Sequence, residues 1–221
     1  PAGTNMVLVS ENEYDHGQAG DGLLTKVTEH VDDSTTRTVE YGYDWRNRHV
    51  WSYQHDGTYG TYSYLTYDNL GRVTRSEQYW DADEDFATQG PELATDDILI
   101  ARSETAYDDR GRVYESTRYA VDPSDGSVGD ALTDRFWYDA AGNVIKSQSG
   151  GTEQFSKTVY DGLGRVVAQY VGFDTDETTY AEAGNVDGDT VFAQTEYDYN
   201  GAGQTIFVTT RDRLHDATGT G

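Results

Sequence analysis

The chain has 221 residues, with 16 lysines and arginines against 40 aspartates and glutamates, which gives a formal net charge of −24 at pH 7. This charge excludes a nucleic-acid binder that works through a basic surface, and an anionic membrane would repel it. Aromatic residues make up 13% of the chain, which argues against an acidic disordered chain, and no apolar run reaches the roughly 20 residues of a transmembrane helix.

A short pattern that begins with Tyr-Asp recurs along the chain. The copies begin at residues 14, 43, 67, 107, 138, 160 and 197, so their spacing ranges from 22 residues (138 to 160) to 40 residues (67 to 107). The copy at Tyr14 is the most degraded, the copy at Tyr43 has Asn47 where glycine belongs, and the copy at Tyr197 continues to Gly201 without an arginine. The four full copies comprise Tyr67, Asp68, Gly71 and Arg72; Tyr107, Asp108, Gly111 and Arg112; Tyr138, Asp139 and Gly142; and Tyr160, Asp161, Gly164 and Arg165. A fixed core therefore alternates with connections of variable length.

Each core has the chemistry of a tight turn between two strands. The aspartate can accept a hydrogen bond from a backbone N–H two residues on, and the glycine tolerates the left-handed conformation that closes a type I turn with a bulge. Asn47 is the best replacement for glycine there. β-branched and aromatic residues flank the turns, as in residues 158–160 and 166–170. We therefore expect a β-hairpin at each core, with turns at residues 67–71, 107–111, 138–142 and 160–164.

A second and looser class of turn separates these cores. It is acidic and variable in length, as in residues 79–85, 119–126 and 170–177, and its shortest form is Asp56-Gly57. The fold class predicted from the two alternating classes is all-β, a continuous antiparallel meander of roughly 12 to 14 strands, with the Tyr-Asp turns on one edge and the acidic turns on the other. The first and last strands, near residues 6–10 and 205–210, carry neither proline nor lysine and would be open edges.

The repeated pattern resembles the RHS/YD-repeat family, which includes bacterial RHS toxin shells, the cage component of Tc toxin complexes, wall-associated surface proteins and teneurins. The resemblance covers about residues 14–210. It implies a β-sheet that spirals into a hollow shell or tube around a passenger domain, or a shell or stalk at the cell surface, of which this chain would be an arc. We therefore expect residues 1–221 to be a single YD-repeat region and a fragment of a longer extracellular, secreted or cell-surface protein. The family's Asp-Pro processing motif is not carried over to Asp122-Pro123, because Ser124 follows it inside a repeat.

Three features are candidate sites. Asp81, Asp83 and Asp85 have the oxygen chemistry of a calcium site, although Phe86 and Pro91 stand against an EF-hand loop, and solvated surface acid is the alternative reading. The repeated arginines could bind anions, but stacking on tyrosine or pairing with aspartate fits a chain of this charge better. Aromatic residues around the Asp56-Gly57 turn could form a sugar-binding patch or pack the sheet. These are Trp51, Tyr53, Tyr59, Tyr62 and Tyr64.

The sequence gives little support for catalysis. Its five histidines are scattered, and it contains no nucleophile elbow, Walker loop or dinucleotide motif. It has no cysteine, which excludes disulfides and thiolate metal sites. We expect no enzymatic activity and no cofactor other than calcium.

Three functions remain open at this point. The first is a structural segment that builds a shell around a passenger or toxin domain, and the second, in the same class, is self-assembly into a tube or fibre. The third is an extracellular binding module that recognises a glycan or a protein through aromatic strips and acidic loops. The expected partners are the remaining repeats of the same polypeptide or other copies of the chain through strand edges, together with a passenger domain or a surface glycan. Neither nucleic acid nor membrane insertion is expected.

Overall fold

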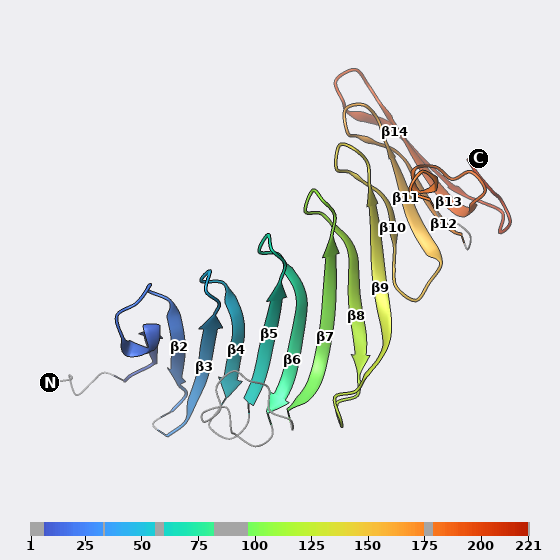
Figure 1. The fold of residues 1–221 in the computed structure, drawn as a ribbon. Coiled ribbons are helices and arrows are strands. Elements are labelled where there is room, and N and C mark those ends of the chain that lie inside the picture. Colours follow the sequence, from blue (N-terminus) through green and yellow to red (C-terminus); the bar gives the residue numbers. More distant parts are fainter. Residues whose placement is uncertain (1–6, 33, 56–59, 82–96, 175–178, 221) are drawn as a thin grey trace. The chain divides into compact units, whose positions relative to one another are not determined.

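The computed structural model describes residues 7–32, 34–55, 60–81, 97–174 and 179–220. In them the chain forms one sheet of fourteen strands whose order in space is their order in the sequence, which confirms the predicted all-β meander (Figure 1). The strands are β1 (Ser10–Tyr14), β2 (Leu24–His30), β3 (Thr36–Tyr43), β4 (His49–His55), β5 (Gly60–Tyr67), β6 (Val73–Asp81), β7 (Ile98–Tyr107), β8 (Val113–Val121), β9 (Val128–Tyr138), β10 (Val144–Gln148), β11 (Gln154–Tyr160), β12 (Val166–Phe173), β13 (Thr190–Tyr199) and β14 (Thr205–Asp212). The helical elements within the described residues are two short 3₁₀ turns, η1 (Asp15–Gly17) and η2 (Glu182–Gly184).

Two kinds of connection alternate along the meander. A Tyr-Asp turn, or Tyr199-Asn200 in the last case, leads from each odd-numbered strand to the next even-numbered strand. A connection of variable length leads from each even-numbered strand to the next odd-numbered one. A β-bulge lies beside the turn between β1 and β2, β3 and β4, β5 and β6, β9 and β10, β11 and β12, and β13 and β14, where two residues of one strand oppose one of the other. None of the described helices is long and apolar enough to cross a membrane.

The chain divides into two compact units, Pro1–Glu104 with Arg118–Asp130, and Thr105–Thr117 with Ala131–Gly221. The first unit has a small aromatic core in which the Tyr53 and Tyr62 rings stack with their centroids 4.6 Å apart, and Trp51 and Tyr79 pack against them. Gly60 leaves the space for the Tyr53 ring, since a Cβ on Gly60 would lie 2.1 Å from it. Aromatic rings thus replace the aliphatic core that this composition lacks.

The second unit has its core where the connection between β12 and β13 folds back on the sheet. Val186 of this connection packs with Ala168, Tyr170 and Val191 of the two strands. Lys157 of β11 holds the connection in place, because its ammonium donates to the Glu182 carbonyl (2.8 Å), to the Asn185 carbonyl (2.7 Å) and to the Asp189 carboxylate (2.6 Å). All three ammonium protons are therefore bonded in a site that excludes water.

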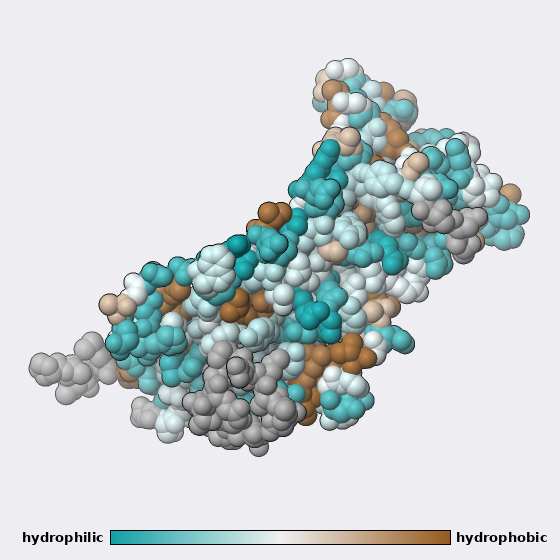
Figure 2. All heavy atoms as spheres, in the orientation of Figure 1, coloured by the Kyte–Doolittle hydropathy of each residue, from teal (hydrophilic) through white to brown (hydrophobic). Residues whose placement is uncertain are grey.

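The remaining surface is mostly polar. Figure 2 shows hydrophilic residues over most of the visible face, with hydrophobic residues in small separate patches. Exposed large apolar side chains lie on turns, such as Trp45, Leu70 and Leu163, and also at the two ends of the sheet. Those at the ends are Val7, Leu8 and Val9 before β1, and Ile206, Phe207 and Val208 on β14. Within the described residues, β1 pairs with β2 and β14 pairs with β13, so each end strand has a neighbouring strand on one side.

Candidate functional site

The repeated turns share one backbone geometry. Within each motif the tyrosine is position 1, the aspartate position 2, the glycine position 5 and the arginine position 6. The position-2 N–H donates to the position-6 carbonyl, and the position-5 N–H donates to the position-2 carbonyl. Position 5 is left-handed in every case: Asn47 (φ 59°), Gly71 (83°), Gly111 (82°), Gly142 (100°), Gly164 (78°) and Gly203 (80°). The four full copies therefore form turns at the residues where the sequence places them.

The last turn lies two residues later than the sequence analysis places it. Position 1 is Tyr199 and not Tyr197, Asn200 takes the aspartate position, and Gly203, not Gly201, has positive φ. Both tyrosines are followed by a residue suited to position 2 and, three residues further, by glycine. The neighbouring motif decides between them, because the Tyr199 ring contacts Arg165 whereas the Tyr197 hydroxyl donates to Gln169 in the middle of the sheet.

The first turn is an enlarged form of the same design. The Asp15 N–H donates to the Leu23 carbonyl, so the acceptor lies eight residues after the donor in place of the usual four. The Asp15 carboxylate still accepts from the backbone at the far side of the turn, from the N–H groups of Gly22 (2.8 Å) and Leu23 (3.0 Å). Leu23 therefore stands at position 6 of this motif.

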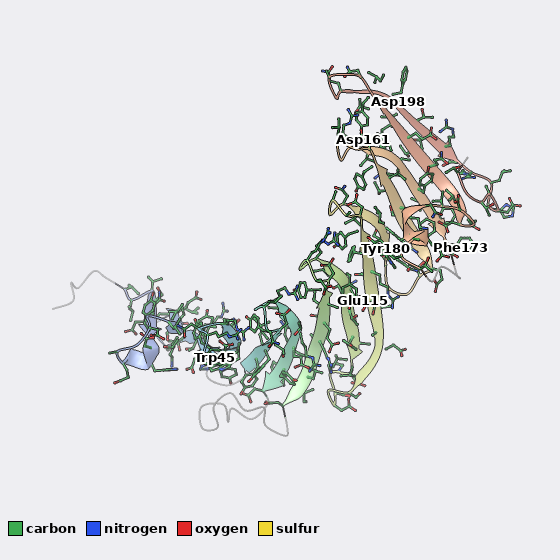
Figure 3. All side chains as sticks on the ribbon, turned by 45° about the horizontal axis from the view of Figure 1, so that its top comes forward. Trp45, Glu115, Asp161, Phe173, Tyr180 and Asp198 are labelled. Carbon is green, nitrogen blue, oxygen red and sulfur yellow. The ribbon has the colours of Figure 1, made fainter. Side chains whose placement is uncertain are left out.

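Within each turn the arginine pairs with the aspartate of its own motif. The Arg Nε donates to the position-2 carboxylate at 2.7 Å in Arg48, Arg112 and Arg165 and at 2.6 Å in Arg72. The other carboxylate oxygen accepts backbone N–H groups, from positions 4 and 6 in these motifs. Asp161 lies at such a turn, between β11 and β12 (Figure 3).

These hydrogen bonds favour the charged carboxylate and hold its pKa below the usual 3.8. For Asp68, Asp108 and Asp161 the backbone N–H of position 6 is the largest cause, and for Asp44 it is the Arg48 side chain. In the Tyr138 motif Asn143 replaces arginine, and its side-chain N–H lowers the pKa of Asp139 in the same way.

The arginine also contacts the tyrosine of the next motif. The Arg48 guanidinium carbon lies 4.6 Å from the centroid of the Tyr67 ring. The corresponding distance is 4.4 Å for Arg112 with Tyr138 and for Arg165 with Tyr199. The same guanidinium reaches the backbone of the next turn, where Arg48 donates to the Asp68 carbonyl (3.3 Å) and Arg112 to the Asp139 carbonyl (3.1 Å). The position-6 arginine therefore joins two turns.

The tyrosine hydroxyl makes a second contact between the same two turns. It donates to the carbonyl of the residue that directly follows position 6 of the preceding motif. The donors and acceptors are Tyr43 and Leu24 (2.8 Å), Tyr67 and His49 (2.5 Å), Tyr138 and Val113 (2.6 Å), Tyr160 and Val144 (3.2 Å), and Tyr199 and Val166 (2.7 Å). We call these contacts between position 6 and the next tyrosine the turn ladder.

The turn ladder coincides with a fixed register between strands. Lys26 pairs with Glu40, Trp51 with Tyr64, Arg75 with Glu104, Lys146 with Lys157 and Ala168 with Glu196. Continued to the turns, each of these registers places the tyrosine of one motif directly across from position 6 of the preceding motif. The connections between these strands run from 4 residues (56–59) to 16 residues (82–97). Connection length therefore does not determine the register.

The turn ladder is the part of the site that the sequence analysis missed. The expected stacking of arginine on tyrosine is confirmed, and the aspartate that pairs with each arginine is the one in its own turn. The sequence did not show that the stacked tyrosine belongs to the next motif. The spacing between copies varies, so sequence distance gives no sign that tyrosine and arginine of successive motifs are opposite each other. The recurrence of arginine beside glycine was the available signal.

The predicted calcium ligands fall into two groups. Asp81 is fully buried, and its carboxylate accepts the Tyr53 hydroxyl at 2.6 Å. Asp83 and Asp85 lie outside the described residues, as do Phe86 and Pro91. In the residues that the structure describes, no group of three His, Cys, Asp or Glu side chains could hold a metal ion. Calcium binding by the full triad stays a prediction.

The predicted aromatic patch is packed and not open. Tyr53 and Tyr62 are 5% and 4% exposed, so neither ring offers a free face to a sugar. Trp51 and Tyr64 pair across β4 and β5 and are partly buried, and Tyr59 lies outside the described residues. Packing therefore accounts for Tyr53 and Tyr62.

An aromatic cavity is found elsewhere, in the second unit. It has a volume of about 320 Å³ and is bounded by Tyr114, Trp137, Tyr138 and Tyr180 together with charged side chains. Tyr180 and Glu115, both labelled in Figure 3, line it, and Glu115 is paired with Arg135 at 3.0 Å. This volume and mixed lining are within the range of small-ligand sites.

No protein-family model and no curated protein matches the sequence. Among solved structures, the chain is similar to a mutant of the Photorhabdus luminescens Tc holotoxin pore, with 15% identity and a TM-score of 0.43 over 93% of this chain and 10% of that chain. It is also similar to the structure of TcdB2-TccC3, with 15% identity and a TM-score of 0.44 over 95% of this chain and 11% of that one. For the same protein without its hypervariable C-terminal region, the values are 13%, 0.40, 89% and 11%. The chain spans about a tenth of the length of these proteins.

Proposed function

We propose that the chain is a structural YD-repeat segment of a larger secreted or cell-surface protein. In this proposal successive hairpins add to a β-sheet wall that encloses a passenger or toxin domain, or that self-assembles into a tube or fibre. The observation that carries it is the turn ladder, because every contact in it serves to align one hairpin with the next. Such a device is useful to a protein that extends a sheet.

The end strands support the same proposal. Backbone groups of an antiparallel strand point alternately to its two neighbours. The Arg213 N–H donates to the Phe192 carbonyl, and the register of β13 and β14 continues from there without interruption to Phe207. The N–H of Val208 therefore points away from β13. Ile206 and Val208 are 52% and 57% exposed, so this edge presents both free backbone groups and apolar side chains.

The proposal predicts that the 221-residue chain associates through its edges. Sedimentation should show concentration-dependent association up to about 100 μM, as expected when strand addition joins unblocked edges. Val208→Pro removes an N–H that does not bond to β13, so it should reduce association while leaving the fold intact. Leu70→Ser is the matched control, because it removes an exposed apolar side chain from a turn and not from an edge. A wild-type chain that stays monomeric at the highest concentration would contradict the proposal.

A second candidate function is an extracellular binding module. The observation that favours it is the cavity bounded by Trp137, Tyr138 and Tyr180. Binding of neutral oligosaccharides or peptides that is lost in Tyr180→Ala and kept in Phe173→Ala, a change of an exposed ring elsewhere, would support it. If no ligand binds, the structural proposal is the one that remains.

A further inference from the structure

The tyrosine of the first motif is the one position-1 tyrosine of the described chain that lies on an end strand. Tyr14 is the last residue of β1, and it pairs with Leu24 of β2 beside a β-bulge. Its side chain is 50% exposed. Within the described residues its hydroxyl has no hydrogen-bond partner. Five other motif tyrosines each donate to a carbonyl of the preceding motif.

The opposite end of the sheet presents the complementary half of a turn-ladder contact. Thr205 directly follows position 6 of the last motif, and the residue in that place supplies the carbonyl in the five tyrosine hydrogen bonds given above. Position 6 itself is Gln204, whose side-chain oxygen accepts from Asn200. The last motif therefore has the backbone acceptor and lacks the guanidinium.

We infer that the β1 edge is a docking site for a β-hairpin of the same repeat type whose position 6 is arginine. This inference rests on the proposed structural function. The incoming hairpin adds antiparallel to β1 with its position 6 across from Tyr14, because the pairs β2–β3, β4–β5, β6–β7, β10–β11 and β12–β13 all have that register. Its guanidinium then covers the Tyr14 ring, and the Tyr14 hydroxyl donates to the carbonyl that follows.

The chemistry of the two edges makes the site selective. A second copy of this chain offers Gln204 and loses the cation–π contact, whereas a hairpin with arginine makes the full set seen between Arg48 and Tyr67. The β1 edge is also acidic, with Glu11 and Glu13 on the strand. A cationic position 6 is thus favoured over a neutral one by both the ring and the surrounding charge.

The test uses two variants of the full chain, each with one edge strand blocked. The only pairing left is then between the β14 edge of one variant, the donor, and the β1 edge of the other, the acceptor. The acceptor carries Val208→Pro, which blocks β14. The donor carries Asn12→Pro, which blocks β1: the His30 N–H donates to the Val9 carbonyl, so by alternation the Asn12 N–H points away from β2. Urea unfolding of each form verifies that it folds. The dissociation constant of the mixed pair is then measured by sedimentation.

The donor change Gln204→Arg should tighten the complex about two- to fivefold, the effect of an exposed cation–π contact. The gain should disappear when the acceptor carries Tyr14→Ala and should remain in large part with Tyr14→Phe, which keeps the ring. Gln204→Lys measures the general effect of charge.

A gain that is equal with Tyr14 and with Tyr14→Ala would overturn the inference, as would a complex whose affinity does not change with Gln204→Arg. Both results would leave the edge-pairing function in place. If donor and acceptor form no complex at any concentration, the inference and the proposed function both fail.

Discussion

At the scale of single residues, each turn depends on a left-handed position 5 and a charged position 2. Glycine was predictable at position 5 because the aspartate-to-glycine offset is constant, and Asn47 shows that asparagine adopts the same conformation. The partner of the aspartate was less predictable. Its partner is the arginine four residues later in the chain, and closure of the turn brings the two side chains together.

At Gly164 the energetic cost of a left-handed backbone can be measured without a steric clash of the new side chain. A Cβ there would have nothing within 4 Å, so the cost of Gly164→Ala should come from its φ of +78° and amount to about 1–2 kcal/mol in the free energy of unfolding. Gly164→Asn should cost less. Gly162→Ala is the control, since a Cβ at Gly162 also has open space and its φ is not positive. Urea denaturation compares the three, and equal stabilities for the variants at the two glycines would show that the left-handed backbone is not the cause.

The lowered pKa of Asp161 predicts an acid-sensitive turn. A carboxylate whose pKa is lower in the folded state stabilises the fold above its usual value of 3.8, and this contribution is lost as the pH falls through the folded pKa. Asp161→Asn keeps the turn geometry, as Asn200 does in the last motif, but cannot ionise. The difference in unfolding free energy between wild type and Asp161→Asn should therefore be largest near pH 7 and shrink below pH 3.8. A difference that is independent of pH would exclude a role for the charge.

At the scale of elements, hairpins were predictable and their alignment was not. Turn chemistry and alternating β-formers locate the strands that flank residues 67–71 or 160–164. The register between hairpins depends on contacts between residues far apart in sequence, such as Arg165 and Tyr199. This is why the last motif was misplaced by two residues. The fold-back of the connection before β13 was also beyond the sequence, because a lysine on a strand normally indicates an exposed side chain.

Lys157 gives the test at this scale. Its side chain is 2% exposed and that of Asp189 is 4% exposed, so Lys157→Ala removes a buried ammonium that bonds to the Asp189 carboxylate and should cost about 3–5 kcal/mol. Replacing both groups, as in Lys157→Met with Asp189→Leu, should cost much less, because no charge is then buried alone. Unfolding of the two variants is compared by urea denaturation. A double variant as unstable as Lys157→Ala would show that the ion pair itself, and not the unpaired charge, determines stability.

At the scale of the whole molecule, the net charge affects the stability of the fold and the sheet edges affect association. The net charge of −24 is spread over a sheet with small cores, so repulsion between carboxylates opposes folding at low ionic strength. The melting temperature should rise between about 10 mM and 500 mM NaCl, as the screening length falls from roughly 30 Å to a few Å. Sodium chloride and potassium chloride should act alike if screening is the cause. A flat or falling melting temperature would show that the acids are too well paired or too far apart to matter.

The central claim is that the turn ladder, and not the length of a connection, sets the register between hairpins. The chain has no cysteine, so a disulfide between Ser52→Cys and Ser63→Cys reports the native pairing of β4 with β5, and Ser52→Cys with Thr61→Cys reports a slip of two residues. Two glycines are inserted between Gly57 and Thr58 to lengthen the connection. With Arg48 and Tyr67 intact, the account predicts that the lengthened chain still forms the 52–63 disulfide under mild oxidation. Formation of the 52–61 disulfide instead, in a chain that keeps Arg48 and Tyr67, would contradict it.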